Sequence, residues 1–142
     1  MQTIPEVQEE LAPRLRWAIT RMARRLRQET GVDLGPSQVA ALATIERHGP
    51  LSPSEVAERE RIKRPTVTRI VRHLEAAGLV ERVRDPLDGR ASILTVTSAG
   101  RNLLRRLRER KTAYLAKRLG VMDAEDRRTL ERAAELLEGM LE

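Results

Sequence analysis

The fold of this chain is decided by residues 49–100, which read GPLSPSEVAERERIKRPTVTRIVRHLEAAGLVERVRDPLDGRASILTVTSAG. Residues 51–55, LSPSE, have the pattern of a capping box: Ser52 supplies the N-cap hydroxyl, and the carboxylate of Glu55 lies three positions later. A proline at the first helical position fits this pattern, because its missing N–H would have no partner there in any case. The pattern therefore predicts a short helix that ends near Arg61.

A second helix is expected to follow, because Pro65 suits the start of a helix and Gly78 its end. The outward face of this helix holds Pro65, Arg69 and Arg72, with Thr68 beside them. Two helices joined by a short turn, the second exposing basic residues, are typical of a helix-turn-helix. The apolar residues between the two ends recur at helical spacing and form one inward stripe: Val67, Ile70, Val71 and Leu74.

Residues 80–84 (VERVR) and 92–96 (SILTV) are short β-prone runs, and the residues between them, DPLDGRA, are rich in turn formers. They predict a hairpin with a loop longer than the tightest types. Another helix is expected before this stretch; it starts at Gly35-Pro36-Ser37, stops at His48-Gly49-Pro50 and turns Val39, Leu42 and Ala43 inward. Helix, short helix, turn, helix and hairpin, in that order, indicate a winged helix-turn-helix. The expected fold class is therefore mainly α with a small β-hairpin wing. The physical reason for this design is that the major groove of B-DNA, about 12 Å wide, admits one α-helix.

Long amphipathic helices are expected at both ends of the chain. The helix-turn-helix body is too small to bury the apolar stripes of both, so we expect them to pack on each other and on a second copy of the chain, with two-fold symmetry. The N-terminal helix ends near Gly31, Thr97 or Ser98 caps a long helix after the hairpin, and Asp123 caps the last one. The stripes are Leu11, Leu15, Ala18, Ile19, Met22 and Leu26 in the first helix, and Leu130, Ala133, Ala134, Leu137, Met140 and Leu141 in the last.

The charge of the chain favours a polyanionic partner. Its 142 residues include 27 Lys and Arg against 21 Asp and Glu, which gives a formal net charge of +6. The bases are concentrated in residues 14–29, 59–73 and 101–118, whereas the C-terminal helix is acidic. One such block is usually only a solvated helix face. Three of them in a chain of this length favour nucleic acid as the partner.

Composition excludes several classes of protein. The chain has no Cys, which excludes disulfides, thiolate metal sites and thiol-based redox sensing, and its two His argue against a zinc or iron site. No paired carboxylates, Ser-His-Asp arrangement or Gly-rich phosphate loop stands out, so we expect neither an enzyme nor a cofactor. No apolar run reaches the ~18 to 20 residues of a membrane span, and the N-terminus lacks the features of a signal peptide. A soluble, cytoplasmic protein without membrane contact is expected.

Residues 49–100 closely resemble the core of the MarR family of bacterial transcriptional regulators. They match the pattern LxxSELAxxxxxxxPTVTRxVxxLExxGLVxRxxDPxDxRxxxxxLTxxG densely, and the match is specific because helix, wing and the following cap occur together. The flanking helices lie where that family has its dimerisation helices. The resemblance implies a single MarR-type domain over residues 1–142, with a winged helix-turn-helix part at 36–97, a recognition helix at 64–78, a wing at 80–96, and dimerisation helices at 5–31 and 98–142.

The resemblance also implies a homodimer on a roughly palindromic operator, with one recognition helix of each protomer in the major groove and one wing beside the minor groove. Arg90 corresponds to the family's wing arginine, Asp88 to the acid that orients it, and Asp85 to the first acid of the wing; both aspartates also suit local backbone N–H groups. Gly89 replaces a bulkier residue, so the wing tip is expected to be more mobile. Arg61 and Lys63 either contact DNA or only add to the local field. The expected DNA-binding residues are Lys63, Arg64, Pro65, Thr66, Thr68, Arg69, Arg72, Arg84, Asp88 and Arg90.

Trp17 and Tyr114 are the only aromatic residues of the chain. Residues of this kind are most often packing residues. The resemblance implies a small-molecule pocket between the dimerisation helices and the winged part, and either ring could line it.

Two functions follow from these observations. The first is a ligand-responsive repressor, in which an effector binds the shape that cannot bind DNA better than the shape that can. The alternative is a weakly specific architectural DNA-binding protein without an effector, which acts mainly through counterion release. The two differ in specificity, since a repressor should prefer its operator by ~10³-fold or more.

Overall fold

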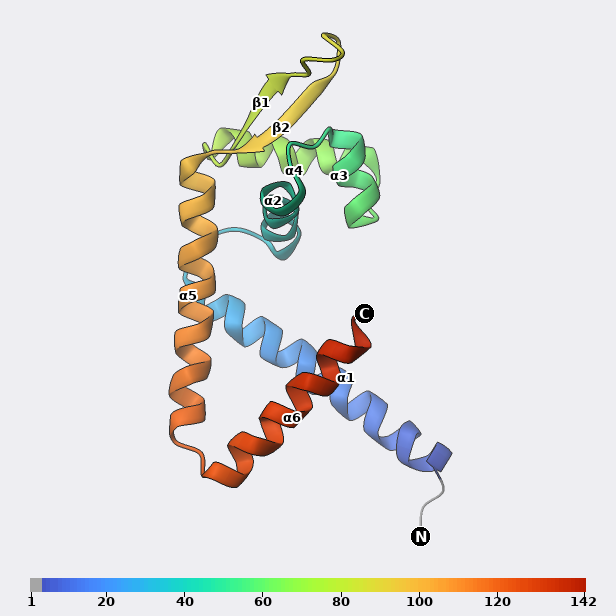
Figure 1. The fold of residues 1–142 in the computed structure, drawn as a ribbon, viewed down its shortest axis with the longest axis vertical. Coiled ribbons are helices and arrows are strands. Elements are labelled where there is room, and N and C mark those ends of the chain that lie inside the picture. The colour runs from blue at the N-terminus through green and yellow to red at the C-terminus, as the bar shows by residue number, and fades with distance from the viewer. Residues whose placement is uncertain (1–3) are drawn as a thin grey trace. The chain divides into compact units, whose positions relative to one another are not determined.

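The computed structural model describes residues 4–142, which form six helices and one antiparallel hairpin (Figure 1). The chain divides into two compact units. Residues Thr30–Arg108 form one, which we call the winged unit; the described residues on either side form the other, which we call the helical unit. The predicted fold class is confirmed. The elements are α1 (Ile4–Thr30), α2 (Pro36–His48), α3 (Pro53–Glu60), α4 (Arg64–Ala76), β1 (Val80–Arg84), β2 (Ser92–Val96), α5 (Ser98–Gly120) and α6 (Ala124–Met140).

The hydrophobic core lies in the winged unit, where α2, α3, α4, the hairpin and the first part of α5 meet. The inward stripe predicted for α4 is buried in full, so the predicted outward face of that helix is confirmed as its exposed side. In α2 the prediction was only partly right, because Ala41 and Ile45 lie in the core beside Leu42, whereas Val39 and Ala43 pack at its edge. The core residues are Ala41, Leu42, Ile45, Leu51, Val56, Val67, Ile70, Val71, Leu74, Leu79, Val80, Leu94, Val96, Leu103, Leu104 and Leu107.

The predicted helix caps are present. The backbone N–H of Ser52 donates to Glu55 Oε1 at 3.0 Å, and the N–H of Glu55 donates to Ser52 Oγ at 3.1 Å, which is the capping box of α3. Asp123 accepts the N–H of Asp126 at 2.8 Å at the start of α6. The end of α4 is also as expected, since Gly78 there has a φ of 74°.

The hairpin is tied to the helices at its base. Its register runs from Val80 opposite Val96 to Arg84 opposite Ser92. Leu51, in the loop before α3, forms a β-bridge with Leu94, through two backbone hydrogen bonds of 3.2 and 2.7 Å. Figure 1 shows α2, α3 and α4 gathered at the foot of the hairpin, whose loop projects away from them.

The helical unit has no buried core of its own. None of its described side chains, in residues 8–29 and 109–142, is buried. Large apolar side chains of α1 and α6 are exposed instead, among them Leu11, Trp17, Ile19, Met22, Leu130 and Leu136. No helix in the described residues has the length and apolar character that crossing a membrane requires.

Candidate nucleic-acid interface

The exposed side of α4 carries a row of basic and hydroxyl side chains. Arg69 and Arg72 lie one turn apart and are both exposed, while Thr66 and Thr68 are half-buried beside them. The Thr68 hydroxyl donates to the backbone carbonyl of Arg64 at 3.1 Å. Its proton is therefore taken, and Thr68 presents its methyl group and its oxygen lone pairs to a partner.

The start of α4 is fixed by contacts with the preceding helix. The guanidinium of Arg64 donates a short hydrogen bond to the hydroxyl of Ser54 in α3. Lys63 is the N-cap residue, and its carbonyl accepts the N–H of Thr66 at 3.0 Å. Pro65 is exposed in the first turn. The first turn of α4 thus has a defined direction, and its N-terminal dipole favours an anion such as a phosphate.

The wing loop is held by its two aspartates. Asp85 Oδ1 accepts the backbone N–H of Leu87 at 2.9 Å, and Asp88 Oδ1 accepts the backbone N–H of Arg90 at 3.1 Å. The loop is closed by the N–H of Asp85, which donates to the carbonyl of Ala91 at 3.0 Å. Both aspartates therefore act as turn residues, and Asp88 positions Arg90 through its backbone.

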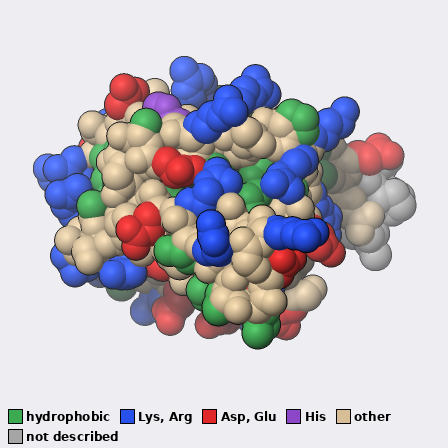
Figure 2. Space-filling view, turned by 90° about the horizontal axis from the view of Figure 1, so that it is seen from above, with side chains coloured by type: hydrophobic (Ala, Val, Ile, Leu, Met, Phe, Trp, Pro, Cys, Tyr) green, Lys and Arg blue, Asp and Glu red, His purple; other side chains and the backbone are tan. Residues whose placement is uncertain are grey.

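Several basic side chains on this face have no partner. Within residues 4–142, the charged groups of Lys63, Arg69, Arg72, Arg84 and Arg90 form no hydrogen bond or ion pair. Figure 2 views the molecule from above, and Lys and Arg side chains gather across the middle of that face. A small cleft of about 270 Å³ lies on the wing. Its lining includes Gly89, Ser92 and three arginines, which are Arg82, Arg84 and Arg90. A surface of this kind attracts a polyanion.

The base of the wing is locked to α4. Glu75 in α4 and Arg82 in β1 form an ion pair of 2.8 Å. The Thr97 hydroxyl donates to the carbonyl of Gly78 at 2.6 Å and accepts the N–H of Gly100 at 3.1 Å, so it joins the end of α4 to the start of α5. The end of α4, the base of the wing and the start of α5 are therefore joined by one ion pair and two hydrogen bonds.

Trp17 and Tyr114 both lie in the helical unit but have different neighbours. Trp17 is 62% exposed and contacts Arg21, whose guanidinium carbon lies 5.6 Å from the ring centroid. Tyr114 is half-buried, with the guanidinium carbons of Arg25 and Arg118 at 5.5 and 5.9 Å from its ring. A hydrogen bond with Tyr114, helped by the charge of Glu29, raises the pKa of Arg25.

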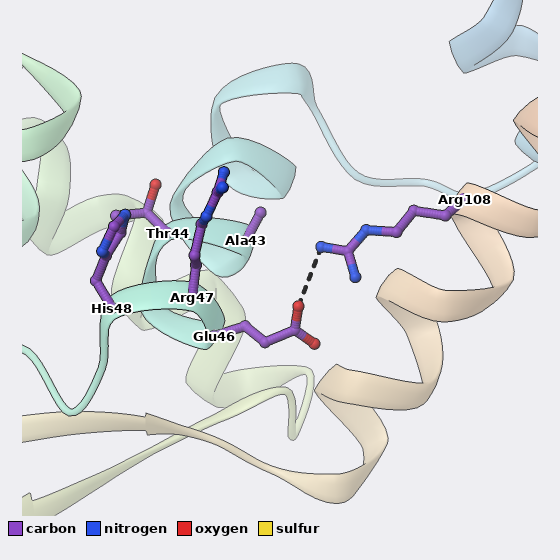
Figure 3. Close-up of a pocket in the computed structure, with 6 residues that line it drawn as sticks. All are labelled: Ala43, Thr44, Glu46, Arg47, His48 and Arg108. Carbon is purple, nitrogen blue, oxygen red and sulfur yellow. Dashed lines mark hydrogen bonds and ion pairs between the residues drawn. The ribbon is translucent and has the colours of Figure 1, made fainter.

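The structure contains a polar pocket that the sequence did not predict. It has a volume of about 410 Å³ and lies between the C-terminal half of α2 and Arg108 of α5 (Figure 3). Glu46 and Arg108 point toward each other across it and form an ion pair of 3.0 Å. Only a contact map would have revealed this pair, because each residue alone looks like an ordinary solvated charge. The lining residues are Ala43, Thr44, Glu46, Arg47, His48 and Arg108.

No cluster of three or more His, Cys, Asp or Glu residues that could hold a metal ion occurs in the part of the chain that the structure describes. Within the described residues, the site consists of basic side chains without a partner on α4 and on the wing. A winged helix-turn-helix with this surface belongs to the class of nucleic-acid-binding regulators.

Comparisons with known proteins identify the family. Residues 32–91 match the model of the MarR family. An HTH-type transcriptional regulator of Mycobacterium bovis is 34% identical over 128 residues, which are 89% of this chain and 90% of that protein. A putative transcriptional regulator of Pseudomonas aeruginosa has a crystal structure with a TM-score of 0.86 and 32% identity, and the match covers 99% of each chain. The chain belongs to the MarR family of transcriptional regulators.

Some structures with a similar fold were solved with DNA. The FabT protein of Streptococcus pneumoniae, in complex with DNA, has a TM-score of 0.66 and 22% identity, and the match covers 98% of this chain and 97% of that one. At this identity the likeness extends to the fold alone.

Proposed function

We propose that this MarR-family regulator is a ligand-responsive transcriptional repressor that binds a pseudo-palindromic operator as a homodimer. The observation that carries the proposal is a set of three arginines without a partner in the described residues: Arg69 and Arg72 on α4, and Arg90 on the wing. The base of the wing is joined to α4 by the ion pair of Glu75 and Arg82. An exposed arginine that no carboxylate neutralises is available to a phosphate or to the O6 and N7 atoms of guanine.

The contacts are proposed to divide between reading bases and holding the backbone. The exposed face of α4 enters the major groove, where Arg69 reads a base edge, Arg72 contacts a base edge or a phosphate, and the Thr68 methyl packs on a thymine methyl. The first turn of α4 and the residue before it are proposed to bind phosphates. These residues are Lys63, Arg64, Pro65 and Thr66. Arg90 enters the adjacent minor groove from the wing, with Asp88 holding its backbone and Arg84 on the flanking phosphates. The complex of FabT with DNA shows that a protein of this fold binds DNA, which supports DNA as the partner.

A second copy of the chain is proposed to cover the helical unit. That unit buries none of its described side chains, and it exposes Trp17 by 62%, Leu136 by 53% and Met140 by 76%. Apolar stripes of this size on a water-exposed helix favour association. Two-fold symmetry would also present two copies of α4 to two half-sites one helical turn apart.

The effector is proposed to be a small molecule that binds near Trp17 or Tyr114. Both rings already lie against guanidinium groups, so an aromatic or anionic compound finds both stacking surface and positive charge there. The compound lowers the affinity for DNA if it binds more tightly to a shape of the dimer in which the spacing of the two recognition helices does not match the two half-sites.

Fluorescence anisotropy tests the proposal directly. A labelled duplex from the region upstream of the gene is compared with a scrambled duplex across a salt series. We expect a preference of about 10³-fold or more for one duplex. Equal and steeply salt-dependent binding to both would favour an architectural protein that acts by counterion release. No binding to either duplex at low salt would contradict a DNA-binding role.

A matched variant controls for net charge. Arg132→Ala removes one positive charge from α6, where the side chain is paired with Glu135 at 2.9 Å. It should leave the preference for the operator unchanged.

A further inference from the structure

The turn between α3 and α4 has an unusual residue at its centre. Arg61 has φ 54° and ψ 45°, in the left-handed region, and it is the one non-glycine residue with positive φ among the described residues. Its N–H donates to the carbonyl of Glu58 at 3.3 Å, and the N–H of Ile62 donates to the carbonyl of Ala57 at 3.1 Å. This pair of bonds is a Schellman motif, whose left-handed position is usually glycine because a Cβ is strained there.

The side chain of Arg61 does not contribute to the fold. The two hydrogen bonds of the turn are made by backbone atoms, and the next residue, Ile62, supplies the apolar contact with the core. Arg61 is exposed, and its guanidinium has no hydrogen bond or ion pair within the part of the chain that the structure describes. Glycine would form the same turn without the strain.

The neighbouring carboxylates do not neutralise Arg61. Glu60 accepts a short hydrogen bond from the hydroxyl of Thr44 in α2 and is half-buried. Glu58 is exposed and forms no ion pair with a base among the described residues. On the other side, Lys63 and Arg64 follow two and three residues later, so the turn and the start of α4 carry three bases within four residues.

We propose that Arg61 is a phosphate-binding residue of the DNA interface, outside the set of contacts made by α4 and the wing. It binds the DNA backbone beside the entry of α4 into the major groove. The inference rests on the proposed function. A guanidinium binds a phosphate through two parallel hydrogen bonds, and the fixed turn anchors the base of the side chain. Such a contact does not depend on the DNA sequence, so it strengthens binding to the operator and to random DNA alike.

The test uses variants for which stability and affinity should change in opposite directions. Arg61→Gly removes both the strain and the charge, so its melting temperature should rise by about 2–6 °C. Its affinity should fall by about 3- to 10-fold on the operator and on a scrambled duplex, and the slope of log K against log salt should become shallower by about 0.9. Arg61→Lys keeps the charge and should keep the slope.

A nearby charge serves as the matched control. Arg59→Ala removes one positive charge from the last turn of α3, two residues away and in helical conformation. It should lower affinity less than Arg61→Gly does, because it changes only the local field. Equal losses for the two variants would overturn the direct contact, and a loss confined to the operator would overturn the assignment to phosphate.

The remaining outcomes separate this inference from the proposed function. If the wild type binds its operator and Arg61→Gly binds with the same affinity and the same salt slope, the role of Arg61 is wrong and the regulator stands. If the wild type binds neither duplex at low salt, both are wrong.

Discussion

Glu46 and Arg108 lie 62 residues apart in the sequence, and they join α2 to α5 through an ion pair of 3.0 Å between Oε1 and Nη2. The Arg108 side chain is 59% exposed and that of Glu46 is 25% exposed, so water screens much of their attraction. The pair crosses the polar pocket next to Arg47 and His48, where Glu46 is the one carboxylate among the lining residues.

We expect Glu46→Gln to lower the free energy of unfolding by less than about 1 kcal/mol. The same substitution breaks the pair with Arg108 and leaves a pocket lined by Arg47 and Arg108 with no carboxylate. Inorganic phosphate should therefore raise the melting temperature of the variant more than that of the wild type. Urea unfolding and thermal melts with and without phosphate measure both effects. Glu135→Gln, which breaks a pair on α6, is the control, and a loss above about 2 kcal/mol for Glu46→Gln would contradict this account.

Gly100 is required by the close approach of α5 to the end of α4. A Cβ at this position would lie 2.7 Å from Cγ1 of Val96 and closer still to the carbonyl oxygen of Leu79. Gly100→Ala should therefore lower the free energy of unfolding by about 1–3 kcal/mol. Gly139→Ala, at a helical position where nothing lies within 4 Å of the added Cβ, should be neutral or raise stability by up to about 1 kcal/mol. Urea denaturation compares the two, and equal effects would contradict the steric argument.

The elements of the fold were predictable because their signals are local. The capping box of Ser52 and Glu55, the inward stripe of α4 and the two β-prone runs each occupy a few consecutive residues, and all appear where the sequence placed them. The outward face of α4 followed from the same periodicity, since burial of Val67, Ile70, Val71 and Leu74 leaves only one side free.

The features that sequence did not reveal depend on contacts between distant residues or on unusual backbone. The ion pairs Glu46–Arg108 and Glu75–Arg82 each join two separate elements, so the periodicity of the sequence cannot predict them. Arg61 occupies a left-handed position that composition rules assign to glycine. In the wing, Asp88 had two possible partners by sequence, and the structure gives it the backbone N–H of Arg90.

The α3 cap makes stability depend on pH. Hydrogen bonds from the backbone and hydroxyl of Ser52 lower the pKa of the Glu55 carboxyl below its ordinary value. A carboxyl with a lowered pKa in the folded protein contributes stability at neutral pH, and this contribution is lost as the pH falls through its folded-state value. The difference in melting temperature between wild type and Glu55→Gln should therefore shrink as the pH falls from 6 to 3. This range brackets the ordinary pKa of a carboxyl group, which is about 4. Ser52→Ala should lower the free energy of unfolding by about 1 kcal/mol at neutral pH. A difference that stays constant with pH would contradict this assignment.

One charge introduced into the apolar stripe of α6 should dissociate the proposed dimer. Leu130 is 43% exposed in the single chain, and a second copy would cover it. Leu130→Glu buries an unpaired carboxylate in that interface, so light scattering after size exclusion should show the mass of two chains for the wild type and of one chain for the variant. Glu131→Gln, the exposed neighbour, should remain a dimer. A wild-type mass of one chain at micromolar protein would refute the dimer.

Arg69 and Arg90 should differ in the way their loss affects DNA binding. Arg69 projects from the middle of α4, where a guanidinium can reach base edges, so Arg69→Ala should weaken operator binding by about 1–3 kcal/mol and relax the preference at one base pair. Arg90 projects from the wing loop, and its positive charge is attracted to the negatively charged minor groove. Arg90→Ala should therefore weaken DNA binding and make its salt dependence shallower. Anisotropy titrations against a set of single-base operator variants, repeated at several salt concentrations, distinguish the two. Equal losses of Arg69→Ala on operator and random DNA would assign Arg69 to phosphate, and unchanged affinity of Arg90→Ala would remove the wing from the interface.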